Sequence, residues 1–146
     1  FLIKFFKKVK KNKLLELPVA EDMQMGMTLG LAMDKNVPIS IFPRWNFLLY
    51  GVSQLVNHID KFSIMSGDYI KPKIIIRTSI GSQKPLHPQA QHIGDFSDGI
   101  QKICTTIEVI KLHEPEEIFP AYKKSYERQD GKNTIIVEYG DYYNDK

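Results

Sequence analysis

The chain has 146 residues, enough for one domain, with 42% hydrophobic and 11% aromatic residues and a formal net charge of +3. Its one cysteine, Cys104, excludes an internal disulfide and favours a reducing compartment, which we expect to be the cytoplasm or, in a eukaryote, the mitochondrial matrix. No apolar run reaches the roughly 20 residues that span a bilayer, and basic residues are not interleaved with aromatic ones. We therefore expect no transmembrane segment and no nucleic-acid partner.

The sequence begins with a basic segment. Residues 1–13 carry six lysines and no acidic residue, and their spacing predicts an amphipathic helix. Such helices contact membranes or nucleic acids in some proteins, but a solvated lysine face is the simpler interpretation. We expect the folded domain to occupy residues 14–146.

The next predicted elements are a short extended segment at Leu14–Leu17 and a helix over Asp22–Met33. The helix is uncharged after its first residue, so we expect it to be buried on most sides. Gly26 and Gly30 lie four residues apart on one face, where they permit close approach of another backbone or simply tight helix packing.

Apolar runs and helical spacing then alternate along the chain and predict strands and helices in turn. The predicted strands are Val37–Phe42, Lys73–Arg77, Ile107–Leu112 and Asn133–Glu138. The predicted helices are Trp45–Met65, Phe96–Ile103 and Glu116–Gln129, the last of which should start late or kink at Pro120. A long polar loop over Thr78–Asp95 follows the second strand.

This alternation predicts an α/β fold, a three-layer sandwich with a mostly parallel sheet flanked by helices. In such sheets, ligands bind beyond the carboxyl ends of the strands. Those ends are expected at Phe42–Arg44, Arg77–Ser79, Leu112–Glu114 and Glu138–Gly140.

Three candidate site groups follow from the residues themselves. Glu21 either stabilises a helix N-terminus or works as an acid–base group. The segment Phe42–Phe47 either packs in a core or subunit interface, or forms a wall for a flat ligand ring. His92, on the polar loop, is either a solvated histidine or an acid–base or polarising group. We find no glycine-rich phosphate loop, no nucleophile elbow and no metal-ligand spacing.

Seven short motifs follow one another between about residues 14 and 143: Leu17–Glu21 with Gly26 and Gly30–Met33, Ile41–Phe47, Gln54–Asn57, Met65–Gly67, Pro72–Arg77, Ala90–His92 and Thr134–Glu138. Together they resemble the pyrimidine-binding (transketolase-like) domain of thiamine-diphosphate enzymes. The closest likeness is to the beta subunit of 2-oxoacid dehydrogenase E1 components of the pyruvate and branched-chain types.

The resemblance implies roles for four residues. Glu21 matches the carboxylate that hydrogen-bonds the N1′ atom of the cofactor's aminopyrimidine ring, which activates the cofactor for 2-oxoacid decarboxylation and acyl transfer to a lipoyl group. Phe47 matches the ring that stacks on the pyrimidine, and His92 matches the active-site histidine near the substrate or the lipoyl thiol. Tyr50 stands where glutamine is common in the family, and we count it as a cofactor-binding candidate.

The resemblance also implies that this chain does not act alone. The family's Gly-Asp-Gly motif for Mg²⁺ and the diphosphate is missing, because Asp98-Gly99 lacks the first glycine. An alpha-type subunit would therefore hold both groups, in an α2β2-like assembly that serves a lipoyl-bearing acyltransferase. We expect the chain to lack the first elements of the domain and the usual C-terminal domain of the beta subunit.

Departures from the family pattern keep two alternatives open. Asp68 replaces a glycine, Thr105-Thr106 replaces Pro-Gly, and Trp45 replaces a smaller residue. One alternative is a transketolase-like or deoxyxylulose-phosphate-synthase-like pyrimidine domain, and the other is a non-catalytic assembly subunit with the same fold. The motifs Met65–Gly67 and Ala90–His92 favour the dehydrogenase branch, whereas the departures favour the assembly subunit.

Overall fold

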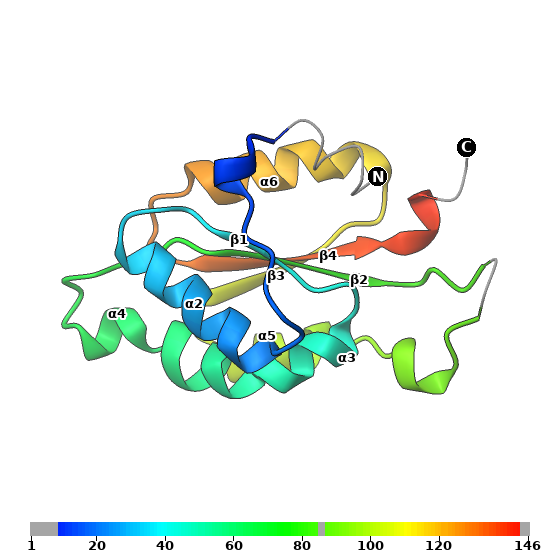
Figure 1. Cartoon of the computed structure of the whole chain (residues 1–146), viewed down its shortest axis with the longest axis horizontal. Coiled ribbons are helices and arrows are strands. Elements are labelled where there is room, and N and C mark those ends of the chain that lie inside the picture. The colour runs from blue at the N-terminus through cyan, green and yellow to red at the C-terminus, as the bar shows by residue number, and fades with distance from the viewer. Residues whose placement is uncertain (1–8, 85–86, 144–146) are drawn as a thin grey trace.

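The computed structural model describes residues 9–84 and 87–143. Four strands form one parallel sheet in the order β1-β2-β4-β3, with helices on both faces (Figure 1). The strands are β1 (Ile39–Ile41), β2 (Ile75–Ile80), β3 (Ile107–Lys111) and β4 (Asn133–Tyr139). The predicted three-layer α/β sandwich is confirmed, and every strand pair in the sheet is parallel.

The helices are distributed unevenly over the two faces. One face carries α2 (Glu21–Met33), α3 (Trp45–Leu48), α4 (Phe62–Met65) and α5 (Ser97–Ile103), and the other carries α6 (Ile118–Glu127) (Figure 1). Shorter turns are η1 (Lys11–Lys13), η2 (Leu49–Gly51), η3 (Gln54–Ile59), η4 (Ala90–His92), η5 (Pro115–Glu117) and η6 (Gly140–Tyr143). From β1 through β2 to β3 the chain advances across the sheet, and β4 then returns. Because crossovers are right-handed, the returning helix α6 lies on the opposite face.

The hydrophobic core lies on both faces of the two central strands. One cluster, which includes Met25, Trp45 and Ile76, fills the space between the sheet and the layer of α2 to α5. A smaller cluster that includes Ile75 and Ile136 lies under α6. Strands β2 and β4 are therefore buried on both sides, which explains their continuous apolar runs in the sequence.

The second strand extends further than the sequence predicted. We expected it to end at Arg77, but Thr78 and Ser79 pair with Val137 and Glu138 of β4, and the strand continues to Ile80. The polar side chains of Thr78 and Ser79 do not resemble a buried strand in the sequence. The loop that follows β2 is therefore shorter than predicted.

The predicted helix over Trp45–Met65 is divided into α3, η2, η3 and α4. The division includes a widened turn in η3, where the Asp60 N–H donates to the Leu55 carbonyl five residues earlier at 2.9 Å. This turn ends at Asp60, whose side chain is fully buried and points to the start of β3. The helical period of the sequence was therefore correct, but the single continuous helix was wrong.

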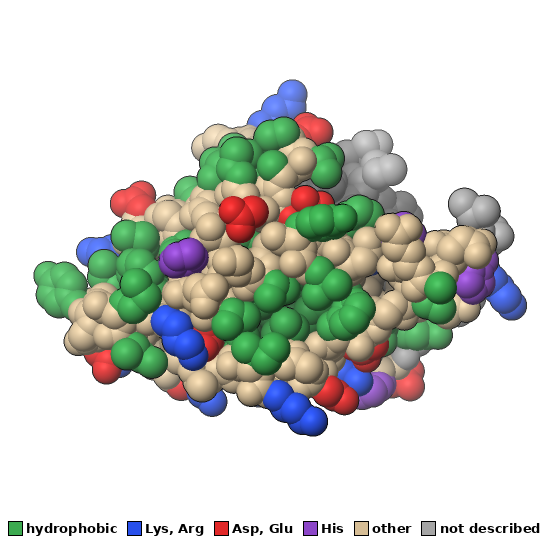
Figure 2. All heavy atoms as spheres, turned by 90° about the horizontal axis from the view of Figure 1, so that it is seen from below, with side chains coloured by type: hydrophobic (Ala, Val, Ile, Leu, Met, Phe, Trp, Pro, Cys, Tyr) green, Lys and Arg blue, Asp and Glu red, His purple; other side chains and the backbone are tan. Residues whose placement is uncertain are grey.

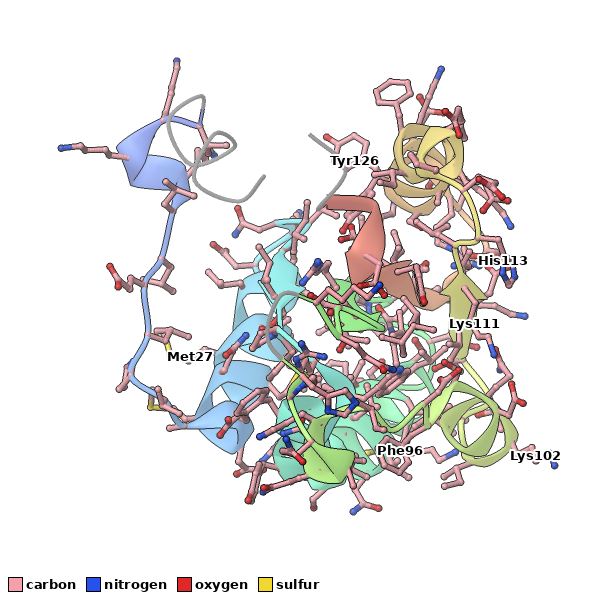
Figure 3. The ribbon with its side chains drawn as sticks, turned by 90° about the vertical axis from the view of Figure 1, so that its right-hand side faces the viewer. Met27, Phe96, Lys102, Lys111, His113 and Tyr126 are labelled. Atoms are coloured by element: carbon pink, nitrogen blue, oxygen red, sulfur yellow. The ribbon has the colours of Figure 1, made fainter. Side chains whose placement is uncertain are left out.

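Helix α2 forms as predicted, but its expected burial on most sides is wrong for the described chain. Its buried residues are Met25, Thr28 and Ala32. Its exposed large apolar residues, each between 38% and 45% exposed, are Met23, Met27, Leu31 and Met33. Gly26 and Gly30 lie on this side, and a Cβ atom on either glycine would meet nothing within 4 Å. We call Met23, Gly26, Met27, Gly30 and Leu31 the open face of α2; Met27 projects outward from the helix in Figure 3.

The first and last predicted helices compare differently with the structure. Most of the helix predicted over residues 1–13 lies outside the described residues, and its described end has one turn at Lys11–Lys13. The last helix starts late, as predicted, because η5 precedes it and α6 begins at Ile118. Pro120 is the third residue of α6, in the first turn, where a helix needs no N–H donor.

The buried carboxylate of Asp60 fixes the start of β3. Its Oδ1 atom accepts hydrogen bonds from the N–H groups of Thr105 at 2.8 Å and Thr106 at 2.7 Å, and its Oδ2 atom lies 2.6 Å from Lys61 Nζ. Burial disfavours ionisation of Asp60, but the hydrogen bonds from Lys61, Thr106 and Thr105 outweigh it and hold the pKa below its usual value. The Thr105-Thr106 departure from the family pattern thus has a structural role.

We predict that Asp60→Ala lowers the free energy of unfolding by about 3 kcal/mol at pH 7, because it leaves two N–H groups and Lys61 without their acceptor. The matched control Asp34→Ala, on an exposed carboxylate, should change it by less than about 0.5 kcal/mol. Since the folded pKa of Asp60 is depressed, its stabilisation is complete above the unfolded pKa near 4 and is lost as the pH falls. Urea unfolding at pH 7 and pH 3 measures this. An equal difference between wild type and variant at both pH values would contradict the assignment.

Candidate functional site

The carboxyl ends of the strands gather at one edge of the molecule, with α3, η4 and η6 around them (Figure 1). Strand β1 leads into α3, β2 leads into the loop that contains η4, and β4 leads into η6. Figure 3 views the molecule from this edge. In open α/β sheets, ligands bind beyond the carboxyl ends of the strands. The predicted site residues Phe47 on α3 and His92 on η4 lie at this edge.

Two of the predicted site residues contact each other. The rings of Phe47 on α3 and His92 on η4 are stacked, with centroids 5.6 Å apart and an interplanar angle of 20°. Both side chains are half-buried. The sequence indicated each residue separately, and the fold brings them together across 45 residues of chain.

Arg44 connects the same two segments and was missed as a site residue. Its Nη1 donates to the carbonyl oxygens of Gly81 at 2.8 Å and His92 at 3.2 Å, and its Nη2 donates to that of Ser82 at 3.0 Å. The Ser82 N–H in turn donates to Asp141 Oδ2 at 2.8 Å. The one available signal was a cation directly after a strand end, inside the aromatic segment that we had singled out.

Unpartnered polar atoms concentrate at this edge. Within the described residues, four buried side-chain atoms have no hydrogen-bond partner: Trp45 Nε1, Asn46 Oδ1, Thr78 Oγ1 and His92 Nδ1. All four belong to α3, β2 and η4. A buried polar atom without a partner costs free energy, and most such atoms in folded proteins are paired. Their concentration here indicates a place where water or a ligand supplies the missing partners.

Glu21 is the first residue of α2 and is half-buried. Turn η2, which follows α3 directly, packs on this end of the helix: a Cβ atom on Gly51 would lie 2.7 Å from Met25 Cγ and 3.2 Å from the Glu21 carbonyl oxygen. No hydrogen bond or ring contact among the described residues joins Glu21 to Phe47 or His92. The structure therefore places Glu21 beside η2, which follows α3 directly, with no hydrogen bond to the stacked rings in the described part of the chain.

Tyr50 lies on the surface. It belongs to η2, beside Gly51, and is 71% exposed. The predicted candidates thus divide into a stacked pair, Phe47 with His92, and two residues, Glu21 and Tyr50, on neighbouring elements.

Two open hollows on the surface lie elsewhere. A groove of about 740 Å³ lies between β3 and α6, and a smaller one lies along α6. Glu108 in the larger groove pairs with Lys124 at 3.1 Å and with Arg128 at 2.9 Å. Because these charges are neutralised within the protein, the groove offers less unsatisfied chemistry than the carboxyl edge.

The described residues contain no group of three or more His, Cys, Asp or Glu side chains that could hold a metal ion. No helix in the described part of the chain has the length and apolar character needed to cross a membrane.

Comparison with known proteins adds no relative. The sequence matches no protein-family model, and no curated protein matches it. The likeness to thiamine-diphosphate enzymes therefore rests on the seven motifs.

We predict that Gly51→Ala lowers the free energy of unfolding by about 1–2 kcal/mol, because the added methyl group overlaps Met25 and approaches the Glu21 carbonyl. The control Gly99→Ala on α5 meets nothing within 4 Å and should instead raise it by roughly 0.5–1 kcal/mol, through helix propensity. Urea unfolding of both variants measures the difference. Equal effects would show that η2 does not pack tightly on the first turn of α2.

Proposed function

We propose that this chain is the beta-type subunit, or part of one, of a thiamine-diphosphate-dependent 2-oxoacid dehydrogenase or decarboxylase. In this proposal the carboxyl edge of the sheet faces the aminopyrimidine ring of the cofactor. The observation that carries the proposal is the coincidence, at one edge, of the motif residues Phe47 and His92 with four unpartnered buried polar atoms.

The chemistry of two side chains at this edge supports a flat, nitrogen-bearing ring as the ligand. Phe47 offers an aromatic face for stacking. Asn46 Oδ1 is an unpartnered acceptor that suits an exocyclic amine. When bound, thiamine diphosphate supplies an electron sink for cleavage of the bond next to a ketone carbonyl.

The chain's own residues then bind, orient and hold protons. Phe47 orients the pyrimidine by stacking, and the Glu21 carboxyl group holds a proton at the ring nitrogen N1′. His92 serves as a proton donor or acceptor near the substrate. Tyr50 contacts the cofactor or the partner that covers it. An alpha-type subunit holds the diphosphate and Mg²⁺, and a lipoyl-bearing acyltransferase receives the acyl group.

Backbone conformation supports the resemblance at one of its departures. Residue 68, where the family has the second glycine after Met-Ser-Gly, is Asp68 and has a φ of 61°. The preceding Gly67 has a φ of 60°. This left-handed conformation favours glycine, and aspartate is among the residues that tolerate it best. The turn thus keeps a glycine-type backbone although the side chain differs.

The open face of α2 supports a partner subunit. An exposed apolar patch commonly marks a protein–protein contact, and glycines allow a second backbone to approach closely. Hydrophobic side chains gather on the surface of the molecule on the side of this helical layer (Figure 2). A partner docked on α2 would lie next to Glu21, at the first turn of the same helix.

The alternatives remain distinguishable. A transketolase-like or deoxyxylulose-phosphate-synthase-like pyrimidine domain would use Glu21 and the aromatic segment in the same way, on a ketose phosphate. A non-catalytic assembly subunit would keep the fold without turnover.

We predict that co-expression with an alpha-type chain bearing the Gly-Asp-Gly motif gives thiamine-diphosphate-dependent decarboxylation of at least one 2-oxoacid in a panel. Glu21→Gln should lower kcat by about 10²–10⁴, because the amide cannot exchange the proton. The control Glu16→Gln, on an exposed carboxylate outside α2, should leave kcat unchanged.

Three outcomes would contradict this proposal. A stable complex with no turnover would favour the assembly subunit. Turnover of ketose phosphates alone would favour the transketolase-like alternative. A fully active Glu21→Gln complex would remove the role assigned to this carboxylate.

We also predict opposite effects of Gly30→Ala on folding and association. In the isolated chain it should raise the free energy of unfolding by roughly 0.5–1 kcal/mol, because the new methyl meets nothing within 4 Å. In the complex it should weaken association at least about tenfold, because the methyl enters the contact. Urea unfolding and sedimentation measure the two effects, with Gly99→Ala as a control for folding alone. Normal association of Gly30→Ala would place the contact elsewhere.

A further inference from the structure

Arg44 is a cation held by backbone carbonyls. Its guanidinium group donates to the carbonyl oxygens of Gly81, Ser82 and His92, which uses three of its five N–H donors. It forms no ion pair with any acidic side chain in residues 9–84 or 87–143. The residue therefore ties the end of β2 to η4 rather than neutralising a carboxylate.

The hydrogen bond from Arg44 to His92 holds the segment around η4. Among hydrogen bonds between described residues, it is the one that joins the segment 87–93 to the rest of the protein. The beginning of the same loop is held separately, because the N–H groups of Ser82 and Gln83 donate to Asp141 at 2.8 and 3.2 Å. Loss of Arg44 would therefore remove the hydrogen bond at the His92 end of the loop. The hydrogen bonds from Ser82 and Gln83 to Asp141, at the β2 end, would remain.

Arg44 and Phe47 hold His92 from two directions. Phe47 stacks on the imidazole ring, and Arg44 binds the backbone carbonyl of the same residue. The two residues are fixed relative to each other, because the Phe47 N–H donates to the Arg44 carbonyl at 3.2 Å in the first turn of α3. One short turn thus determines both the position of the His92 backbone and the orientation of its ring.

We propose that Arg44 is a positioning residue that acts through His92. It holds η4 against the strand end so that the imidazole projects at the carboxyl edge in one orientation. Arginine suits this role because its planar fork reaches two carbonyls of the strand end and one of η4 at once, whereas a lysine ammonium is a point charge on a flexible stem. The catalytic consequence rests on the proposed function, but the placement of His92 is a property of this chain.

The first test is NMR spectroscopy of the isolated chain. In the wild type, the His92 ring protons should show the ring-current shift that Phe47 stacking causes, and Phe47→Leu should abolish it. Arg44→Lys and Arg44→Gln should move the His92 shifts toward those of Phe47→Leu. They should also speed amide hydrogen exchange of His92, whose N–H donates to the Gln89 carbonyl within η4, at least tenfold. Arg128→Lys is the matched control, because that guanidinium binds Asp130 and Glu108 and should leave the His92 signals unchanged.

Two results would overturn the proposal. One is unchanged His92 shifts and exchange rates in folded Arg44 variants. The other needs no variant to fold: a wild-type chain without the ring-current shift, or without a nuclear Overhauser effect between Arg44 and His92.

In the active complex, Arg44→Lys should lower kcat and leave KM for the 2-oxoacid unchanged, since Arg44 does not touch substrate. The double variant Arg44→Lys/His92→Ala should be no slower than His92→Ala alone, and an additive loss would contradict action through His92. A complex without turnover would refute the proposed function, while the NMR comparison would still decide the role of Arg44.

Discussion

The parallel pairing of β2 with β4 is the constraint on which the rest of the structure depends. Six residue pairs, from Ile75 with Thr134 to Ile80 with Tyr139, join segments about 60 residues apart and make both strands internal. A buried ion pair crosses the two strands, with Arg77 Nη2 and Glu138 Oε2 2.7 Å apart, and Tyr122 of α6 donates to the other carboxylate oxygen at 2.8 Å. A shift of one residue would move the side chains of one strand to the opposite face and separate Arg77 from Glu138, so this ion pair helps to specify the register.

The candidate site is a consequence of that pairing. Parallel strands carry their carboxyl ends to one edge, so the segments that follow β1 and β2 meet there although the sequence separates them. The short turn of Arg44 to Phe47 and the loop around His92 then contact each other by a ring stack and a hydrogen bond. The four buried polar atoms without hydrogen-bond partners lie on α3, β2 and η4. They therefore belong to the elements around the carboxyl edge, where parallel sheets of this kind bind ligands.

The fold was predictable from the sequence where the pattern of apolar residues reports which side chains are buried. Strands buried on both faces appear as continuous apolar runs, and the helical period of Trp45–Met65 was correct, but Thr78 and Ser79 hid the end of β2 because polar residues pair in a sheet as well as apolar ones do. Motifs and topology indicated Phe47 and His92 as candidates, and the fold stacks their rings. Arg44 was not indicated, because its acceptors are backbone carbonyls 37 to 48 residues away, which leave no side-chain pattern. The apolar period of α2 likewise could not indicate whether its own chain or another covers it.

We propose that this chain contributes the pyrimidine side of a thiamine-diphosphate site that a partner completes. The decisive experiment is calorimetric titration of thiamine diphosphate with Mg²⁺ into the alpha-type chain alone, and then into its complex with this chain. We expect saturable binding that is at least tenfold tighter in the complex and is weakened again by Phe47→Ala. Binding of equal affinity with and without this chain would contradict it.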